Sequence, residues 1–440
     1  MPKICVVGTG YVGLVSGACL ADFGNKVICV DIDPERIEGI RRGMMPIYEP
    51  GLKELVQRNH SAGRLEFTTD LESSVRKSLV IFSAVGTPMG DDGAADLGAV
   101  YDVARDVAAA MDDYKVFVQK STVPVGTSEE AGRIISENLA KEVPFDRVSN
   151  PEFLREGSAI EDFMRPNRVV IGVESERARD IMREIYRPLY LLETPIVFTS
   201  IRTAELIKYA SNAFLAVKIS FINELADLCE KTGANVSEVA KGLGLDKRIG
   251  PKFLHAGVGY GGSCLPKDVS AILHTSEKAG VPLPVIRAAS DVNESRIPKL
   301  LEKLETLMPG LEGRTVAVLG LSFKPNTDDL RHAPALKLID TLLERGASVN
   351  AYDPIAMENA RERYGDRIEF CDDAYVAAEG ADALVIMTEW NEFRQLEMER
   401  IRDALDSPVV IDCRNIYKPA DMKEMGFSYD SFGRPGFPRI

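Results

Sequence analysis

The sequence predicts an α/β protein in which two doubly wound parallel sheets are joined by an all-helical segment. Short apolar runs alternate with helical patterns over the first 200 residues, and the stretch from about 200 to 310 is helical throughout. The last third repeats the alternation of the first. Because 440 residues exceed one ordinary domain, we predict three, at residues 1–200, 201–310 and 311–440.

Composition and charge exclude several kinds of partner. Apolar residues make up 45% and charged residues 27%, as in soluble globular proteins. A net charge of −14 offers no basic field for nucleic acid or an anionic membrane, so an anionic substrate must meet locally placed Lys and Arg. The uncharged run Ile4–Ala21 contains glycines that favour strand, turn and helix over a membrane or targeting segment.

The seven cysteines show neither metal-ligand spacing nor a CxxC pair, and we expect no metal site. Cys5, Cys29 and Cys229 lie in apolar runs or helical patterns. We therefore expect them to be core residues of a protein in the reducing cytoplasm.

The N-terminal segment carries a dinucleotide-binding fingerprint in its full context. A strand at Lys3–Val7 leads into Gly8-Thr9-Gly10-Tyr11-Val12-Gly13, a helix runs to about Phe23, and a strand at Lys26–Val30 ends at Asp31. The glycines admit a pyrophosphate to the helix N-terminus, and the acidic residue binds both ribose hydroxyls. Asp31 would repel a 2′-phosphate, which favours NAD over NADP, although the nearby Arg36 leaves NADP open.

Three polar turns follow apolar stretches of the same predicted sheet. Further strands are expected at Leu79–Ala84, Lys115–Lys120 and Val169–Gly172. The turns read Val85-Gly86-Thr87-Pro88, Ser121-Thr122-Val123-Pro124 and Asn150-Pro151-Glu152. Any one of these turns alone is explained by a proline that simply ends a strand and begins a loop. Three together favour one cleft wall, because ligands of such sheets bind beyond the carboxyl ends of the strands.

Residues 202–231 predict a long helix that is apolar on most faces and contains neither Gly nor Pro. Lys208 and Asn212 interrupt the apolar pattern at i, i+4 spacing, which puts both side chains on one side. An exposed face and a functional pair explain them equally well. Gly233 ends this helix, further helices run through 235–308, and Pro309-Gly310 with Gly313 forms the connection to the last third.

A glycine-rich loop at Gly257–Asp268 interrupts the helical segment. Its glycines are Gly257, Gly259, Gly261 and Gly262. Glycines allow the backbone to lie close against a ligand, where a Cβ would collide. Cys264 follows at once, with Lys267 and Asp268 one helical turn beyond it. A lone cysteine is usually inert, but a helix start or a nearby cation lowers the pKa of a thiol below its free value of about 8.5.

The last third resembles a second nucleotide-binding unit without the glycine pattern. Its strand at Thr315–Leu319 leads into Gly320–Pro325, and Gly346–Pro354 echoes the segment that ends at Asp31. Further echoes are Ala383–Thr388 and Val409–Arg414. Cations at its strand ends suit an anionic ligand other than a second dinucleotide, although plain surface charge explains each one singly. These cations are Lys324, Arg331 and Arg414.

Taken together, these motifs resemble those of the UDP-glucose / GDP-mannose dehydrogenase family over essentially the whole chain. The matching segments, in the family's order and approximate spacing, are Gly8–Gly13, Val85–Pro88, Ser121–Pro124, Asn150–Gly157, Lys208–Asn212, Gly257–Asp268 and Ser322–Arg331. The resemblance implies two Rossmann-like domains bridged by a long helix in a helical dimerisation domain, and a homodimer or higher homo-oligomer. The implied reaction is the two-step, NAD-dependent oxidation of the C6 alcohol of UDP-glucose to UDP-glucuronate.

The resemblance also implies catalytic roles. Cys264 would form a thiohemiacetal and then a thioester, while Lys208 and Asn212 polarise the C6 oxygen. Asp268 would assist a water or Lys208, and Glu152 would be the general base. The implied residues toward NAD are Gly8, Gly10, Tyr11, Val12, Gly13, Asp31, Arg36, Gly86, Thr87, Thr122, Glu156, Lys267 and Arg331, of which Thr122 would also help to hold the water. Those toward the sugar nucleotide are Glu152, Phe153, Leu154, Arg155, Lys208, Asn212, Arg248, Phe253, Tyr260, Gly261, Phe323, Lys324 and Arg414, with Arg248 reaching in from the partner subunit.

The chemistry of the residues favours the same reaction. Alcohol oxidation needs a hydride acceptor and a base but no thiol, whereas onward oxidation of an aldehyde needs the tetrahedral adduct that a thiolate supplies. GDP-mannose remains an alternative substrate. A β-hydroxyacid dehydrogenase would use Lys208 and leave Cys264 idle. A nucleotide-sugar sensor without turnover is disfavoured by the intact set of reactive residues.

Overall fold

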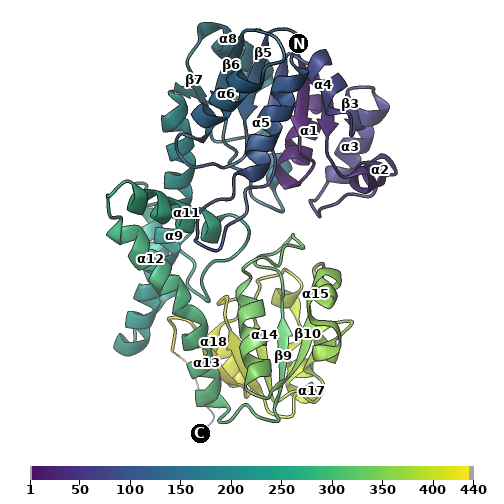
Figure 1. Ribbon diagram of the computed structural model, residues 1–440. Coiled ribbons are helices and arrows are strands. Elements are labelled where there is room, and N and C mark those ends of the chain that lie inside the picture. The colour runs from purple at the N-terminus through teal and green to yellow at the C-terminus, as the bar shows by residue number, and fades with distance from the viewer. Residues whose placement is uncertain (1, 436–440) are drawn as a thin grey trace. The chain divides into compact units, whose positions relative to one another are not determined.

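A computed structural model describes residues 2–435 of the chain. These residues form two compact units, one comprising the described residues up to Ser211 with Ser270–Thr275 and the other Asn212–Val269 with the described residues from Ser276 onward. Figure 1 labels many of their helices and strands. No helix among the described residues combines the length and the apolar character that crossing a membrane requires.

The first unit is built on an eight-stranded sheet with the order β3-β2-β1-β4-β5-β6-β7-β8. The strands are β1 Lys3–Val7, β2 Lys26–Val30, β3 Leu65–Thr68, β4 Val80–Ser83, β5 Lys115–Gln119, β6 Phe145–Ser149, β7 Val169–Val173 and β8 Ile196–Thr199. All neighbours are parallel except β6 and β7, which are antiparallel. The strand order reverses between β1 and β4, which defines the doubly wound topology predicted from the sequence.

Helices cover both faces of this sheet (Figure 1). They are α1 Tyr11–Asp22, α2 Pro34–Arg41, α3 Leu52–Ser61, α4 Leu71–Lys77, α5 Gly98–Ala110, α6 Thr127–Asn138, α7 Ala159–Met164 and α8 Glu176–Ile185, with the 3₁₀ turn η1 at Arg187–Leu192. One core lies under α1, α3, α7 and α8, and the other under α4, α5 and α6. The continuous apolar strands are those of a sheet buried on both faces.

Two glycines of the first turn allow α1 to approach the sheet. Gly8 has a φ of +98°, and a Cβ there would lie 2.7 Å from the Ala84 carbonyl oxygen. A Cβ on Gly13 would lie 1.9 Å from the carbonyl oxygen of Gly8. Both positions therefore require glycine for close packing of the helix on the sheet.

The helical segment begins with α9 Ile201–Thr232, within one residue at each end of the helix predicted at 202–231. Gly233, with a φ of +76°, follows it as predicted. The other helices are α10 Val236–Leu245, α11 Leu265–Lys278, α12 Pro284–Glu294 and α13 Arg296–Leu307. α13 packs Leu300 and Leu304 into the core beneath the second sheet.

The second sheet has six parallel strands in the order β11-β10-β9-β12-β13-β14. They are β9 Thr315–Leu319, β10 Ser348–Tyr352, β11 Glu369–Phe370, β12 Ala383–Ile386, β13 Val409–Asp412 and β14 Ser428–Ser431. The helices are α14 Pro334–Glu344, α15 Met357–Tyr364, α16 Ala374–Ala378, α17 Met398–Ala404 and α18 Pro419–Glu424, with 3₁₀ turns η2 at Gly365–Arg367 and η3 at Phe393–Gln395. Cores on both faces confirm the second doubly wound domain.

Asp353 occupies the position in the second sheet that Asp31 occupies in the first, directly after the strand beside the central one. Its carboxylate accepts six hydrogen bonds, from the backbone of Leu321, Ser322, Ile355 and Ala356, the Ser322 hydroxyl and the Trp390 indole. A carboxylate offers about four lone-pair sites. Asp353 is therefore saturated by the protein, which supports the prediction that the second unit does not hold a dinucleotide through this acid.

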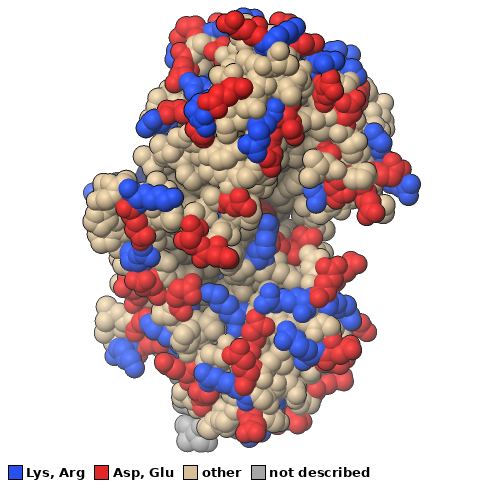
Figure 2. Space-filling view, in the orientation of Figure 1, with Lys and Arg blue, Asp and Glu red and all other residues tan. Residues whose placement is uncertain are grey.

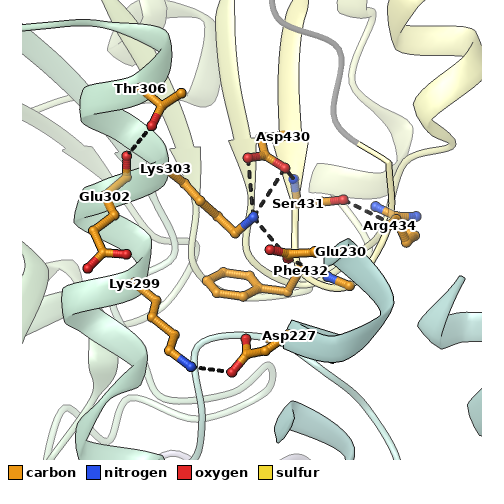
Figure 3. Close-up of polar contacts among 12 residues, drawn as sticks. Asp227, Glu230, Lys299, Glu302, Lys303, Thr306, Asp430, Ser431, Phe432 and Arg434 are labelled. Atoms are coloured by element: carbon orange, nitrogen blue, oxygen red, sulfur yellow. Dashed lines mark hydrogen bonds and ion pairs between the residues drawn. The ribbon is translucent and has the colours of Figure 1, made fainter. Parts of the chain in front are cut away.

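Charged side chains of α9 and α13 meet in a polar seam, formed by Asp227, Glu230, Arg296, Lys299 and Lys303. Figure 3 shows Asp227, Glu230, Lys299 and Lys303 of this seam. Lys303 Nζ lies 2.9 Å from Glu230 Oε1 and 3.2 Å from Oδ2 of Asp430, which lies within β14. The seam therefore ties the C-terminal strand to the long helix within the second unit.

Candidate functional site

The turn after β1 and the end of β2 form a site that fits NAD. Asp31 Oδ2 accepts hydrogen bonds of 2.7 Å from both the backbone N–H and the hydroxyl of Thr9. Burial raises the pKa of Asp31, but these hydrogen bonds, that from Asp33 and the charge of Arg36 outweigh it and hold the pKa below its ordinary value. The acid is thus a carboxylate at neutral pH, as ribose recognition requires.

Open space in front of two glycines suits a diphosphate. A Cβ built on Gly10 or on Gly86 would meet no atom within 4 Å. Arg36 Nη1 lies 3.3 Å from Asp31 Oδ2, so this arginine is paired with the acid. Val12 packs partly buried against the core. Bound NAD would thus be held by the backbone of the first turn and by the Asp31 carboxylate.

The three polar turns at the ends of neighbouring strands lie together, as predicted. Thr87 Oγ1 donates to the carbonyl of Thr122 at 2.9 Å, and Ser121 Oγ donates to that of Val85 at 2.7 Å. The third turn is held by Asn150, whose Nδ2 donates to the Val170 carbonyl at 2.8 Å. Because β4, β5 and β6 are parallel neighbours, the turns form one wall.

A buried ion pair joins Glu152 to Lys208. Lys208 Nζ lies 2.9 Å from Glu152 Oε1, and the two side chains are 4% and 5% exposed. This burial eliminates the interpretation of Lys208 as part of a solvated helix face. Burial raises the pKa of Glu152, but the charge and hydrogen bond of Lys208 and the Leu154 N–H outweigh it, so the pKa lies below the ordinary value.

A third ionisable group near this pair, Lys120, was predicted only as a strand end. It is buried, and its Nζ donates to Asn150 Oδ1 at 3.3 Å. Burial lowers the pKa of Lys120 to about 8, and the charges of Glu152 and Lys208 act on it in opposite directions. A strand pattern carries no information about such a group, because its neighbours come from other segments.

The segment after Glu152 is held mainly by protein contacts. The Phe153 ring lies 5.4 Å from Lys208 Nζ and 3.6 Å from the guanidinium of Arg168. Arg155 pairs with Asp162 at 2.6 Å, and Glu156 is buried. The aromatic face beside Lys208 is thus partly covered by an arginine.

Glu49, which the sequence analysis missed, links the first turn to this segment. Tyr11 donates its hydroxyl hydrogen to Glu49, and the same carboxylate accepts from the N–H groups of Gly157 at 2.7 Å and Ala159 at 2.8 Å. Tyr11, which is expected toward NAD, therefore has its hydroxyl engaged within the protein. Glu49 follows no periodic pattern, and its partner Gly157 lies 108 residues away, so no local signal announces it.

In the second unit, Asn212 and Asp268 meet at the start of α11. Asn212 Nδ2 donates to Asp268 Oδ2 at 2.6 Å, and Lys267 Nζ lies 2.7 Å from Asp268 Oδ1. The Asp268 N–H donates to the Cys264 carbonyl at 2.9 Å, which makes Cys264 the residue at which the helix begins. Asp268, expected to assist a water or Lys208, is bonded here to Asn212 and Lys267.

Cys264 is the one cysteine of the seven that is not buried. Its Sγ lies 3.5 Å from Ser263 Oγ. A cysteine that is only partly buried and lies at a helix start is typical of reactive cysteines. The expectation that Cys5, Cys29 and Cys229 are core residues is confirmed, because all three are buried.

The loop glycines lie against the protein itself, whereas the sequence analysis placed them against a ligand. A Cβ on Gly257 would lie 2.3 Å from the Cys413 carbonyl oxygen, one on Gly261 would lie 2.2 Å from that of His332, and one on Gly262 would lie 2.7 Å from the Phe323 ring. The glycines therefore allow the loop to pack on the second sheet's turns, and Tyr260 between them is buried.

The predicted cations of the last third lie at the carboxyl ends of its strands. Arg414 Nε donates to the Met387 carbonyl at 2.7 Å, and its Nη2 donates to that of Phe323 at 3.3 Å. Lys324 Nζ lies 5.1 Å from the Phe323 ring, so these three residues gather around one turn. Arg331 pairs with Asp329 at 2.8 Å and stays largely exposed.

Arg248 and Phe253 lie between α10 and α11. Arg248 is 89% exposed and pairs with Asp246 at 2.6 Å, while Phe253 adopts a left-handed φ of +65°. Figure 2 shows cations and carboxylates interspersed on the face in view rather than gathered by sign.

Two doubly wound sheets, an NAD-type turn with its acid, a buried lysine–carboxylate pair and a helix-start thiol define a nicotinamide-dependent dehydrogenase with two nucleotide-binding domains. Three sequence models of the UDP-glucose/GDP-mannose dehydrogenase family match most of this chain. They are the NAD binding domain at residues 2–190, the central domain at 202–295 and the UDP binding domain at 317–419. The chain belongs to the UDP-glucose/GDP-mannose dehydrogenase family and is an NAD-dependent oxidoreductase.

Individual relatives match over nearly the whole chain. The UDP-glucose 6-dehydrogenase of Rhizobium meliloti (strain 1021) is 54% identical over 438 residues, which cover 98% of this chain and 100% of the relative. UDP-glucose 6-dehydrogenase TuaD of Bacillus subtilis (strain 168) is 49% identical, covering 99% and 94%. The structure of a UDP-glucose dehydrogenase from the hyperthermophilic archaeon Pyrobaculum islandicum superposes with a TM-score of 0.92 at 40% identity, covering 98% and 97%.

We expect NAD to be preferred over NADP, because the ionised Asp31 would lie where a 2′-phosphate has to bind. The measurement is kcat/KM for each cofactor in the wild type, in Asp31→Ala and in Asp70→Ala, which removes an exposed helix-capping carboxylate. Asp31→Ala should narrow the preference, and Asp70→Ala should leave it unchanged. Equal values for the two cofactors in the wild type would contradict this prediction.

Replacing Glu152 with Gln should lower the free energy of unfolding by about 3 kcal/mol at pH 7, because the Lys208 cation stays buried without its carboxylate. Since the pKa of Glu152 is depressed in the folded state, its contribution is present above the unfolded pKa of about 4.3 and is lost as the pH falls through the folded value. The difference between wild type and variant in urea unfolding should therefore shrink on acidification.

The matched control is Glu129→Gln, which breaks the solvent-exposed pair between Glu129 and Arg202. Exposed pairs contribute at most about 1 kcal/mol, so this variant should unfold close to the wild type. If Glu129→Gln lowered the free energy of unfolding as much as Glu152→Gln does, burial of the Glu152 pair would not explain its contribution to stability.

Proposed function

We propose that the chain oxidises the C6 alcohol of UDP-glucose to the carboxylate of UDP-glucuronate, through a thiohemiacetal and a thioester on Cys264. Cys264, a partly buried cysteine at the start of α11, carries this proposal, because a dehydrogenase that stops at the aldehyde has no use for a thiol there. The UDP-glucose 6-dehydrogenases similar to this chain, at 54% and 49% identity, support the choice of substrate.

Lys208 and Asn212 hold the C6 oxygen in this mechanism. They lie one turn apart on α9, and each is oriented by a carboxylate, Lys208 by Glu152 and Asn212 by Asp268. Both donate hydrogen bonds to the oxygen and stabilise the negative charge that develops as its proton passes to a water assisted by Asp268. Bound NAD supplies the hydride acceptor for each of the two oxidations.

Cys264 converts the aldehyde into a substrate for the second oxidation. Its thiolate forms a C–S bond to the aldehyde carbon, and the carbonyl oxygen becomes the oxyanion of a thiohemiacetal that Lys208 and Asn212 stabilise. Loss of hydride from this carbon leaves a thioester. Water then adds, with its proton passing to Glu152 and Thr122 helping to hold it, and the C–S bond breaks to release the acid and the thiolate.

The UDP group is assigned to the turns of the second sheet. Lys324 and Arg414 supply positive charge next to Phe323, which offers an aromatic face. Because the Asp353 carboxylate already accepts six hydrogen bonds from the protein, it is not free to bind the ribose of a second dinucleotide there. A diphosphate needs such locally placed cations in a chain of net charge −14.

A homodimer through α9 is part of the proposal. Phe214, Phe221 and Leu228 recur every seven residues on one side of the helix and are 65%, 46% and 57% exposed. Large apolar side chains in such a row are typical of protein–protein contacts. Arg248, which is also exposed, would then reach the substrate of the partner subunit.

The seven free cysteines support a location in the reducing cytoplasm.

One UDP-glucose should yield two NADH in the wild type, and the yield should collapse in Cys264→Ala, because no thioester can form. A panel of sugar nucleotides with NAD, monitored at the NADH absorbance, tests both the substrate and the stoichiometry. The buried Cys413→Ala is the matched control and should retain two NADH. Faster turnover of GDP-mannose would reject the substrate, and two NADH from Cys264→Ala would reject the mechanism.

A further inference from the structure

Three side chains form hydrogen bonds with both the N–H and the carbonyl groups of the backbone at the start of the Gly257–Asp268 loop. The N–H of Gly257 donates to Asn223 Oδ1 at 2.8 Å, and its carbonyl accepts from Arg296 Nε at 3.2 Å. At Tyr260, the N–H donates to Asn293 Oδ1 at 2.8 Å and the carbonyl accepts from Asn293 Nδ2 at 3.2 Å. We call Asn223, Asn293 and Arg296 the loop clamp.

The clamp replaces the hydrogen bonds that a regular element would supply. Val258 and Tyr260 are buried, and a buried backbone group without a partner is costly. The loop is also rich in glycine, which loses more conformational freedom on ordering than any other residue. Side chains from α9, α12 and α13 hold this segment in one conformation.

The clamp residues are themselves fixed in the second unit. Arg296 is fully buried, and its Nη1 lies 2.9 Å from Asp227 Oδ1. Asp227 also pairs with Lys299, in the polar seam of α9 and α13 (Figure 3). Asn223 and Asp227 are one turn apart on α9, so one face of that helix holds both the loop backbone and its arginine.

Between the clamp and the thiol, the loop backbone is held by further contacts with the protein. The Gly262 N–H donates to the Arg331 carbonyl at 2.9 Å, and Gly261 and Gly262 lie against His332 and Phe323. Cys264 follows two residues later, where α11 begins. A shift of the Tyr260 backbone is therefore passed on to the position of the thiol.

We propose that Asn293 is a positioning residue for Cys264: its carboxamide holds both backbone groups of Tyr260 and so sets where the thiol emerges. This inference rests on the proposed function, in which Cys264 is the nucleophile. Asn293 takes no part in the chemistry, but a displacement of about 1 Å at a reacting atom costs on the order of 100-fold in rate.

Two nearly isosteric variants test the assignment. Asn293→Leu removes both hydrogen bonds, whereas Asn293→Asp keeps the acceptor for the Tyr260 N–H and loses the donor to its carbonyl. In both variants we expect kcat with UDP-glucose to fall by about 10- to 100-fold, with KM for UDP-glucose and NAD within about 3-fold of the wild type. The matched controls are Asn350→Leu and Asn350→Asp, since the half-buried Asn350 donates to the Ala377 carbonyl at 3.1 Å in the same unit.

Alkylation of Cys264 by iodoacetamide gives a second readout that a merely structural role would not change. Because the other six cysteines are buried, modification of the folded protein reports on this thiol. The pH at which its alkylation is half-maximal should move in both Asn293 variants and stay at the wild-type value in the Asn350 variants. Should Asn293→Leu not fold, Asn293→Ala takes its place with the same readouts, since it also removes both hydrogen bonds and adds no charge.

Wild-type kcat and an unchanged alkylation profile in a folded Asn293 variant would overturn the proposal. So would an effect of Asn293→Asp alone, with a folded Asn293→Leu normal, because the added charge and not the lost bonds would then be responsible. Losses of kcat and Tm equal to those of the Asn350 variants would reduce Asn293 to a structural residue. Failure of the proposed function is recognised separately, because Cys264→Ala would then retain two NADH per sugar.

Discussion

The buried pair of Glu152 and Lys208 is the interaction on which the reacting end of this enzyme depends. Only 4% of the Lys208 side chain is exposed, and the Glu152 carboxylate, 2.9 Å away, stabilises its buried charge. The pair fixes the end of the polar wall formed by the turns after β4, β5 and β6. It also keeps the Lys208 ammonium away from bulk water. Because water would screen this charge, the buried ammonium acts more strongly on a nearby oxygen.

Helix periodicity distributes the other polar contacts of α9. Lys208 bonds Glu152, Asn212 bonds Asp268, Asn223 holds Gly257, and Asp227 holds Arg296. Each of these side chains is oriented by a partner from another segment. The long helix thus carries two chemical groups near its start and the supports of the cysteine loop further along, at spacings set by about 1.5 Å of rise per residue.

Much of this architecture is readable in the sequence where local patterns carry it. The strands at Lys3–Val7 and Thr315–Leu319 and the long helix are fixed by apolar runs and by glycines that end them. Asp31 and Cys264 are announced by their motifs. The edge strands β3, β8 and β11 lack the long apolar runs that mark the central strands, and they were not predicted.

What could not be predicted depends on partners distant in the chain. The burial of Lys208, the role of Glu49 and the contacts of Asn293 arise from pairing across tens of residues, which no window of local sequence records. The loop glycines show the same limit. Their need for close approach is evident from the sequence, but the protein surface that approaches them is specified only by the fold.

The central claim is that Cys264 becomes covalently acylated during turnover. Rapid acid quenching of the wild type with UDP-glucose and NAD, followed by mass spectrometry of the peptides, tests this claim most directly. We predict a UDP-glucuronoyl adduct on the peptide that contains Cys264, removable by hydroxylamine as a thioester should be. Steady formation of two NADH per sugar with no adduct on that peptide at any quench time would contradict the account.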